Sequence, residues 1–320
     1  MILGHERQIE YLNTVLRRGS FAHAYLFCGP EEVGKFTVAK LVAQFFHCEK
    51  QPGSLQNVCG DCAQCRSVEA GLHPQVIFLD EERTLVSKKD KRKDIPIEDI
   101  RELKRLFVYA PEGDKWRIAL LNHADKMSLE SSNAFLKLLE EPGSNTLLIL
   151  ISSSPELLLP TILSRVQILR FSYVSDKVLE DFFSPRIKEA SLLKDMLKLA
   201  DGRIGLMFNF LEDEAIFQKE KNFFDTVCSV LKSGQIPEVL RVSEKISQDD
   251  NLRRKGAEVV IRVLREKLLR GVALLNNNSS TQGLKEISRT AEIMETTNVN
   301  PRLAMDILLL EAANVIHRTV

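Results

Sequence analysis

The sequence predicts an α/β domain with a mostly parallel sheet, followed by an all-α region. Three observations favour this fold class. Over the first 170 residues, apolar runs of strand length alternate with segments in which apolar residues recur every three or four positions. From about residue 174 onward, only the helical pattern occurs. The length of 320 residues also corresponds to about two domains, at roughly 150 residues each.

The predicted strands are short apolar runs separated by helical segments. The first is followed directly by a glycine-containing turn. Strands that alternate with helices form a mostly parallel sheet that helices cover on both faces. The runs are 24–28, 76–79, 118–121, 147–151 and 166–171.

The predicted helices of this region each have one apolar face. In the second of them, apolar residues stand at i, i+3, i+4 and i+7, the spacing of a helix with a single buried face. Gly19 ends the first helix, and Pro142 ends the last. The segments are 9–16, 38–45, 100–107 and 128–141.

The remaining chain is predicted to be helical in two parts. Short helical patterns over 174–211 are interrupted at Asp201-Gly202, and helices then continue to the end of the sequence. The polar run 276–282 is a predicted loop, and Pro301 stands where a final helix begins. The predicted boundaries are 1–172 for the α/β domain, 173–212 for a small helical lid and 213–320 for a helical C-terminal domain.

Composition restricts the kinds of function. Lys+Arg and Asp+Glu both number 44, so the net charge is zero, whereas a free-standing nucleic-acid clamp is usually basic. Any DNA contact is therefore local or shared with other subunits. The mixed-charge run 88–94 is either a solvated loop or a contact to the DNA backbone.

The sequence also predicts a cytoplasmic protein. No apolar run approaches 18 residues, so no membrane span is expected. Charges at Glu6, Arg7 and Glu10 interrupt the start of the chain, where a secretory signal needs an unbroken apolar stretch. In a reducing compartment, the six cysteines are metal ligands or buried thiols rather than disulfides.

Residues 29–35 (GPEEVGK) follow a predicted strand and precede a predicted helix, the context of a phosphate-binding loop. In such loops, glycines such as Gly29 and Gly34 let backbone N–H groups surround phosphates, and a lysine such as Lys35 reaches the β and γ phosphates. The next position needs a Ser or Thr hydroxyl for magnesium, but it is Phe36. The sequence therefore keeps the pattern of a phosphate-binding loop but lacks the hydroxyl that would bind magnesium.

A second loss stands after the strand at 118–121. Magnesium coordination and activation of water need carboxylates at the next two positions, and these are Asn122 and His123. Asp125 is interpreted as a helix N-cap or a surface residue. Three readings of Lys35 remain open: a structural lysine in a vestigial loop, nucleotide binding without turnover, and a competent ATPase.

Four cysteines form a candidate metal site. Cys59, Cys62 and Cys65 stand in two overlapping C-x2-C units, and Cys48 lies eleven residues before the first of them. Four thiolates suit one structural Zn²⁺ ion in a closed tetrahedral site. An iron–sulfur cluster and unligated thiols are the alternatives. The other two cysteines, 28 and 228, are interpreted as core residues.

Several segments resemble one family, the bacterial clamp-loader subunits of the AAA+ class. The similarity spans roughly residues 1–172 and includes the cysteine module. It implies an AAA+ P-loop domain with a parallel sheet, a small helical lid and a C-terminal helical collar. The segments that carry it are 22–48, 73–80 (HPQVIFLD), 97–105 (IEDIRELKR), 131–142 (SSNAFLKLLEEP) and, in the collar, 300–313 (NPRLAMDILLLEAA).

Within this family, the sequence most resembles the delta-prime type, which keeps the AAA+ fold but has lost ATPase residues. Phe36, Asn122 and His123 are departures of that kind. In the predicted lid, Gly205 takes the place of the sensor-2 arginine, with Arg203 two residues earlier. The resemblance also makes Ser152 and Ser153 candidates for sensor 1.

The resemblance assigns a role to Arg165. Residues 163–166 (LSRV) resemble the Ser-Arg-Cys motif of the family, with Val166 in place of cysteine. It implies that Arg165 is an arginine finger for ATP bound by a neighbouring subunit, and that Ser164 caps or positions the turn. Such a finger contributes about 10³–10⁵ in rate. Without the motif, Arg165 reads as a surface arginine in an ion pair.

The resemblance implies a non-motor subunit of the DNA polymerase III clamp loader, which helps to load the sliding clamp onto primed DNA during replication. Its implied partners are gamma/tau-like ATPases and a delta-like subunit, with the clamp contacted indirectly and no membrane. Its implied location is the nucleoid-associated replisome. It implies one structural zinc, doubtful ATP binding and no polymerase activity of the chain's own.

Two other functions stay open. An active gamma/tau-like ATPase would need Thr37 and Asp125 to restore metal binding. A stand-alone zinc-containing nucleic-acid-binding module is disfavoured by the neutral charge and by an aromatic content of 7% with one Trp.

Overall fold

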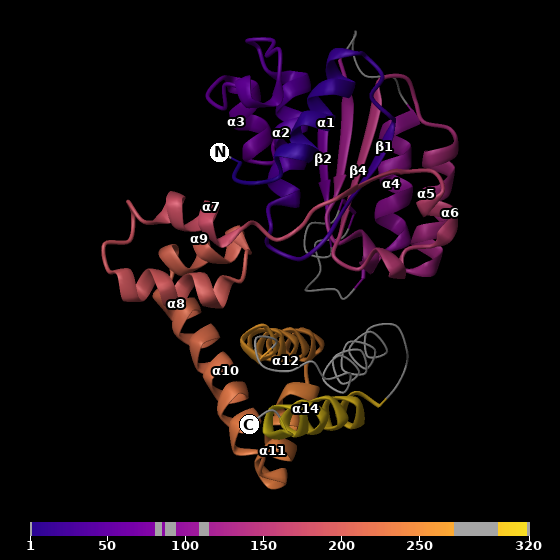
Figure 1. Cartoon of the computed structure of the whole chain (residues 1–320). Coiled ribbons are helices and arrows are strands. Elements are labelled where there is room, and N and C mark those ends of the chain that lie inside the picture. The colour runs from indigo at the N-terminus through magenta and orange to yellow at the C-terminus, as the bar shows by residue number, and fades with distance from the viewer. Residues whose placement is uncertain (1, 81–84, 87–93, 109–114, 272–299, 319–320) are drawn as a thin grey trace. The chain divides into compact units, whose positions relative to one another are not determined.

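The computed structural model describes residues 2–80, 85–86, 94–108, 115–271 and 300–318. The chain divides into two compact units, Met1–Asn209 and Phe210–Val320, which are described separately (Figure 1). The predicted polar loop at 276–282 lies outside the described residues, as does the charged run at 88–94 except for Asp94. The predicted division into three parts remains a prediction.

The first unit is built on a five-stranded sheet in the order β2-β3-β4-β1-β5, and every strand pair is parallel. The predicted α/β class with a parallel sheet is thereby confirmed, as is the all-α character of the described C-terminal helices. Strand β1 lies between β4 and β5, although β4 follows it by more than 100 residues. The strands are β1 (Ala24–Cys28), β2 (Val76–Leu79), β3 (Arg117–Leu121), β4 (Thr146–Ser152) and β5 (Gln167–Arg170).

Helices cover both faces of the sheet, and for this reason β1 and β4 are buried along their whole length (Figure 1). Alternate residues of β1 point into two apolar layers: Tyr25 and Phe27 face α1 and α2, while Leu26 faces α4 and α5. The helices are α1 (Glu6–Arg17), α2 (Lys35–His47), α3 (Ala63–Glu69), α4 (Ile97–Val108), α5 (Leu129–Glu140) and the short α6 (Pro160–Leu163).

In the part of the chain that the structure describes, three short 3-10 turns join these elements: η1 (Leu55–Asn57), η2 (Ala124–Lys126) and η3 (Pro155–Leu157). The predicted helix at 128–141 is confirmed as α5, whose N-cap hydroxyl, on Ser128, accepts a hydrogen bond from the Ser131 amide. The small helices α3 and α6 have no clear apolar periodicity, and the sequence did not predict them as separate elements.

The small helical region predicted after residue 172 consists of α7 (Asp176–Phe183), α8 (Ala190–Ala200) and α9 (Ile204–Glu212). The predicted break at Asp201-Gly202 is confirmed, since both residues have positive φ, 48° and 81°. Phe183 of α7 contacts Phe208 of α9, with ring centroids 5.2 Å apart.

The second unit contains helices in its described part: α10 (Glu214–Ser233), α11 (Ile236–Ser247), α12 (Asp250–Gly271) and α14 (Pro301–Arg318). The predicted start of the final helix at Pro301 is confirmed. Its core joins all four helices through residues such as Val227, Val239, Val260 and Leu308. Nowhere in the described ranges is a helix both long and apolar enough to cross a membrane.

Candidate functional site

The candidate phosphate site lies at one edge of the sheet, where three neighbouring parallel strands end. The loop 29–34 follows β1 and leads into α2, residues 122–125 follow β3, and Ser152 and Ser153 end β4 and begin the next loop. The sequence predicted that these three segments form one site. The parallel sheet brings them to the same edge, because β3, β4 and β1 are neighbours in it.

The first glycine of the loop is required by the packing of the backbone. Gly29 has φ of 140°, and a Cβ at this position would lie 2.2 Å from the carbonyl oxygen of Phe171, the residue after β5. The amide of Phe171 donates to the carbonyl of Cys28 at 2.7 Å, so this close approach belongs to the strand pairing itself. The glycine therefore has a structural role that does not depend on phosphate.

Gly29→Ala is expected to destabilise the protein by about 3 kcal/mol or more, because it adds a backbone clash to an unfavourable φ. Chemical denaturation monitored by circular dichroism would measure the change. Gly53→Ala is the matched control, since a Cβ there meets no atom within 4 Å. The control should stay within about 0.5 kcal/mol of the parent. Equal stability of the two variants would contradict the packing argument.

The lysine of the loop is turned into the loop itself. Lys35 is 6% exposed, and its Nζ donates to the carbonyl oxygens of Gly29, at 2.6 Å, and of Pro30. Burial lowers the pKa of Lys35 to about 8, although the charges of Glu31 and Asp125 oppose the shift. The ammonium group is thus held by two backbone carbonyl oxygens of its own loop.

The position after the lysine has no hydroxyl to offer a metal. The ring of Phe36 packs against Phe78, the third residue of β2, with centroids 5.8 Å apart, whereas Thr37 is exposed on the next position of α2. Because one helical position turns the side chain by about 100°, Thr37 does not replace the missing group.

The residues after β3 are arranged differently from the prediction. His123 has φ of 49° and precedes η2, and Asp125, interpreted from the sequence as a cap or surface residue, is instead half-buried within η2. Its carboxylate accepts a hydrogen bond from the Ser152 hydroxyl at 2.5 Å. Sequence reasoning missed this pair, because its members are 27 residues apart, one in η2 and the other at the end of β4.

The predicted lid region contacts the loop through Gly205, which stands where the resemblance places the sensor-2 arginine. The amide of Gly205 donates to the Glu32 carbonyl at 2.7 Å, and a Cβ on Gly205 would lie 2.9 Å from that oxygen. Arg203 Nε donates to the carbonyl of Ala200 at 2.9 Å, at the end of α8. The loop thus occupies the space that a side chain at position 205 would need.

The two loop glutamates make protein contacts. Glu32 Oε1 accepts a hydrogen bond from Asn209 Nδ2 at 3.1 Å, which links the loop to α9. Glu31 Oε1 accepts one from the Ser153 hydroxyl at 3.3 Å. Both predicted sensor-1 serines therefore lie at the site, where they bind carboxylates of the chain.

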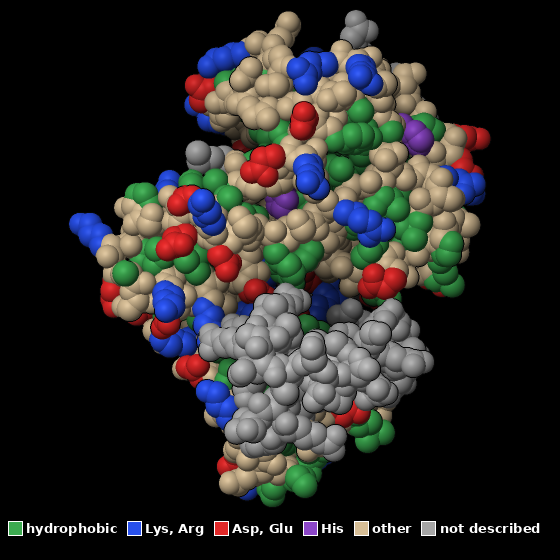
Figure 2. All heavy atoms as spheres, in the orientation of Figure 1, with side chains coloured by type: hydrophobic (Ala, Val, Ile, Leu, Met, Phe, Trp, Pro, Cys, Tyr) green, Lys and Arg blue, Asp and Glu red, His purple; other side chains and the backbone are tan. Residues whose placement is uncertain are grey.

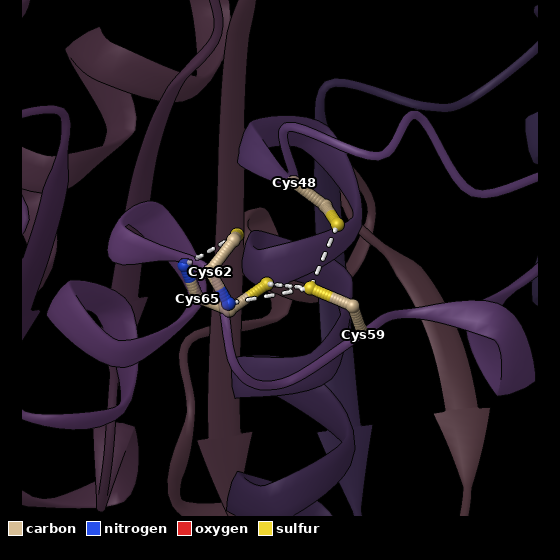
Figure 3. A group of neighbouring side chains, drawn as sticks. All are labelled: Cys48, Cys59, Cys62 and Cys65. Atoms are coloured by element: carbon tan, nitrogen blue, oxygen red, sulfur yellow. Dashed lines mark hydrogen bonds between the residues drawn. The ribbon is translucent and has the colours of Figure 1, made fainter.

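The four predicted metal-ligating cysteines come together in space (Figure 3). Cys48 caps the end of α2, Cys59 lies in the following loop, and Cys62 and Cys65 stand at the start of α3. Their sulfur atoms all lie within 4.8 Å of one another.

The donor set fits a structural zinc ion. Zn–S bonds of about 2.3 Å in a tetrahedron place sulfur atoms about 3.8 Å apart. The Sγ atoms of Cys48 and Cys59 are 3.5 Å apart, and those of Cys59 and Cys65 are 3.8 Å apart. The amides of Cys62 and Cys65 point to the sulfurs of Cys59 and Cys62, both at 3.4 Å, as donors that stabilise thiolate ligands (Figure 3).

The cysteine module is attached to the sheet domain by buried polar contacts. Asn13 on α1 accepts a hydrogen bond from the Leu55 amide at 2.8 Å and donates to Gln56 at 2.7 Å. Gln44 on α2 donates to the Cys65 carbonyl at 3.1 Å. A metal ion in this module would therefore stabilise the connection between α1, α2 and α3.

The predicted finger residue is accessible. Arg165 follows α6, and its side chain is 38% exposed in an ion pair with Glu140, Nη2 to Oε1 at 2.9 Å. The Ser164 hydroxyl donates to the Thr161 carbonyl at 3.0 Å, which holds the turn after α6. The contacts match the prediction from the residues alone, a surface arginine in an ion pair, and they leave the finger role as a proposal.

Comparison with known sequences gives matches to subunits of DNA polymerase III. A sequence model of the family described as DNA polymerase III, delta subunit, matches residues 4–175. DNA polymerase III subunit delta' of Bacillus subtilis is 28% identical over 230 residues, 72% of this chain and 64% of the relative. Subunit delta' of Pseudomonas aeruginosa is 36% identical over 148 residues, 46% of this chain and 42% of the relative.

Relatives with the names tau and gamma are also similar. DNA polymerase III subunit tau of Bacillus subtilis is 26% identical over 230 residues, 67% of this chain and 39% of the relative. A solved gamma subunit-related protein of DNA polymerase III from Thermotoga maritima aligns over 96% of this chain and 99% of its own, with 17% identity and a TM-score of 0.41. The matched part of the chain spans less than two thirds of the length of these curated relatives.

The sheet order and the loop between β1 and α2 define a P-loop protein of the AAA+ class, with Phe36 at the position after the loop lysine. Within that class, the chain belongs to the DNA polymerase III delta subunit family, whose sequence model covers more than half of it. The resemblance to the delta-prime type is confirmed by the two relatives that have this name.

Proposed function

We propose that the chain is a non-motor subunit of a DNA polymerase III clamp loader, acting in the cytoplasm as part of the replisome. It would pack its C-terminal helices into a collar with gamma/tau-like ATPases and a delta-like subunit. It would help to load the sliding clamp onto primed DNA without contacting the clamp directly. Family membership and the altered phosphate site support this function.

The observation that carries the proposal is the set of hydrogen bonds made by the Lys35 ammonium group. Its Nζ donates to two carbonyls of its own loop, and Phe36 occupies the position of the metal-binding hydroxyl. Hydrolysis needs a lysine on the β and γ phosphates, a magnesium ligand and a group that orients water. The hydrogen bonds of Lys35 to its own loop and the ring at position 36 therefore support a chain that does not hydrolyse ATP.

The isolated chain is accordingly expected to hydrolyse no ATP, and Lys35→Ala is expected to change neither nucleotide binding nor turnover. Isothermal titration calorimetry with Mg-ATP and a phosphate-release assay would measure both. The surface variant Lys50→Ala, which loses only an exposed ion pair with Asp61, controls for a change of charge. Hydrolysis that depends on Lys35 would favour a gamma/tau-like ATPase.

The active ATPase is the second candidate because tau subunits are also similar to this chain. It would require Thr37 and Asp125 to bind a metal. Thr37 is exposed, and the Asp125 carboxylate already accepts the Ser152 hydroxyl. These contacts favour the non-motor subunit.

Action on DNA by the chain alone has less support. Figure 2 shows Lys and Arg interspersed with Asp and Glu over the drawn face of the described residues. Because non-specific DNA binding depends on neutralising several phosphates, this face of mixed charge gives little support for DNA binding by the chain alone.

A further inference from the structure

The guanidinium group of Arg165 has three protein contacts. Nη2 lies 2.9 Å from Oε1 of Glu140. Nη1 donates to the Thr161 carbonyl at 3.0 Å and to the Ser164 hydroxyl at 3.2 Å. A guanidinium carries five N–H donors. Among the described residues, these contacts use three of them and leave two for a further ligand.

Two helix ends produce this arrangement. Helix α5 ends at Glu140, and Pro142 prevents its continuation. Helix α6 starts at Pro160 and ends just before Ser164. The C-terminal end of a helix carries partial negative charge, which favours a cation such as Arg165. The carboxylate of Glu140 adds a full charge on one side, while the end of α6 provides the carbonyl on the other.

We propose that Glu140 is a positioning residue for Arg165. Its carboxylate holds one edge of the guanidinium group, so that the remaining N–H donors are ordered before they meet phosphate oxygens on a neighbouring subunit. This inference rests on the proposed function as a non-motor subunit and on the arginine-finger role that the family resemblance implies for Arg165. Ordering a catalytic side chain in advance lowers the entropy lost in the transition state, and it requires a supporting residue of this kind.

The expected effect is modest, since both members of the ion pair are partly exposed, with 38% and 49% of the side-chain surfaces accessible. Exposed pairs are weak, so Glu140→Gln should reduce the turnover that depends on Arg165 by about 2- to 5-fold. The KM for ATP should stay the same, because Glu140 acts on the group that stabilises transition-state charge and makes no contact with bound nucleotide.

The test uses the full chain in a reconstituted loader. Glu141→Gln is the matched control, because it removes the same charge from the next residue, which is exposed. The control should leave turnover unchanged. Glu140→Gln should have no further effect on turnover when Arg165→Ala is already present. Glu140→Gln and Glu141→Gln should each keep the parent's melting temperature. Nuclear magnetic relaxation of the Arg165 side chain in the isolated chain should show greater motion in Glu140→Gln.

Three outcomes would overturn the inference. Turnover could be unchanged or raised in Glu140→Gln, the loss could persist in the Arg165→Ala background, or Arg165 could be equally mobile in the two proteins. If Arg165→Ala itself leaves turnover unchanged, the arginine-finger role of Arg165 fails as well. Loss of turnover in Arg165→Ala but not in Glu140→Gln removes the positioning role alone.

Discussion

Arg165→Ala is expected to reduce ATP hydrolysis at the adjoining site of an assembled clamp loader by about 10³-fold or more, as the loss of an arginine finger does in related phosphoryl transfer. The guanidinium stabilises charge that develops on the γ-phosphate, and alanine offers nothing in its place. Its ion pair with Glu140 is partly exposed, so the fold should lose less than about 1 kcal/mol.

Single-turnover phosphate release from the reconstituted loader would measure this effect, since ATP sites elsewhere in the complex can conceal it in the steady state. Arg18→Ala is a suitable control, because Arg18 is an exposed arginine at the end of α1. Arg165→Lys separates charge from geometry: lysine keeps the charge but loses the planar fork of donors, so it should recover only part of the rate. Full activity of Arg165→Ala in an intact complex would refute the finger role.

Cys62→Ser is expected to lower the zinc content from about one ion per chain to near zero. Cys62 is the N-cap of α3, where its sulfur accepts a hydrogen bond from the Cys65 amide. Because serine is also a good N-cap, the substitution keeps the helix start and removes a metal ligand. Apparent zinc binding in small structural sites is worth about 10–16 kcal/mol, so the loss should be large.

Atomic absorption would measure the metal, and hydrogen exchange would show which part of the chain loses protection. Protection should fall between Cys48 and Glu69, since Asn13 and Gln44 then hold the module without its metal. Cys228→Ser, on α10 and outside the cluster, should retain zinc. Zinc should also dissociate as pH falls, because protons compete for the thiolates. A metal-free preparation with parental stability and exchange would contradict a structural zinc.

Local patterns predicted the elements and the candidate residues well. Continuous apolar runs predicted β1 and β4, because a strand covered on both faces has no polar side to display. The C-x2-C spacing predicted the cysteine cluster, because ligands three residues apart at a turn and helix start face one point. Small elements such as α3 were missed, since seven residues give too little periodicity.

The sequence by itself determined the fold class, the phosphate loop and its missing hydroxyl, and the cysteine ligands. Each of these features depends on residues that lie close together in the chain. The tertiary structure alone decided that Lys35 binds its own loop, that Gly205 contacts Glu32, and that Arg165 pairs with Glu140. The last two contacts join residues far apart in the chain, and the direction of the lysine side chain depends on the packing around it. Periodicity and spacing report only what a residue does within its own helix, strand or turn.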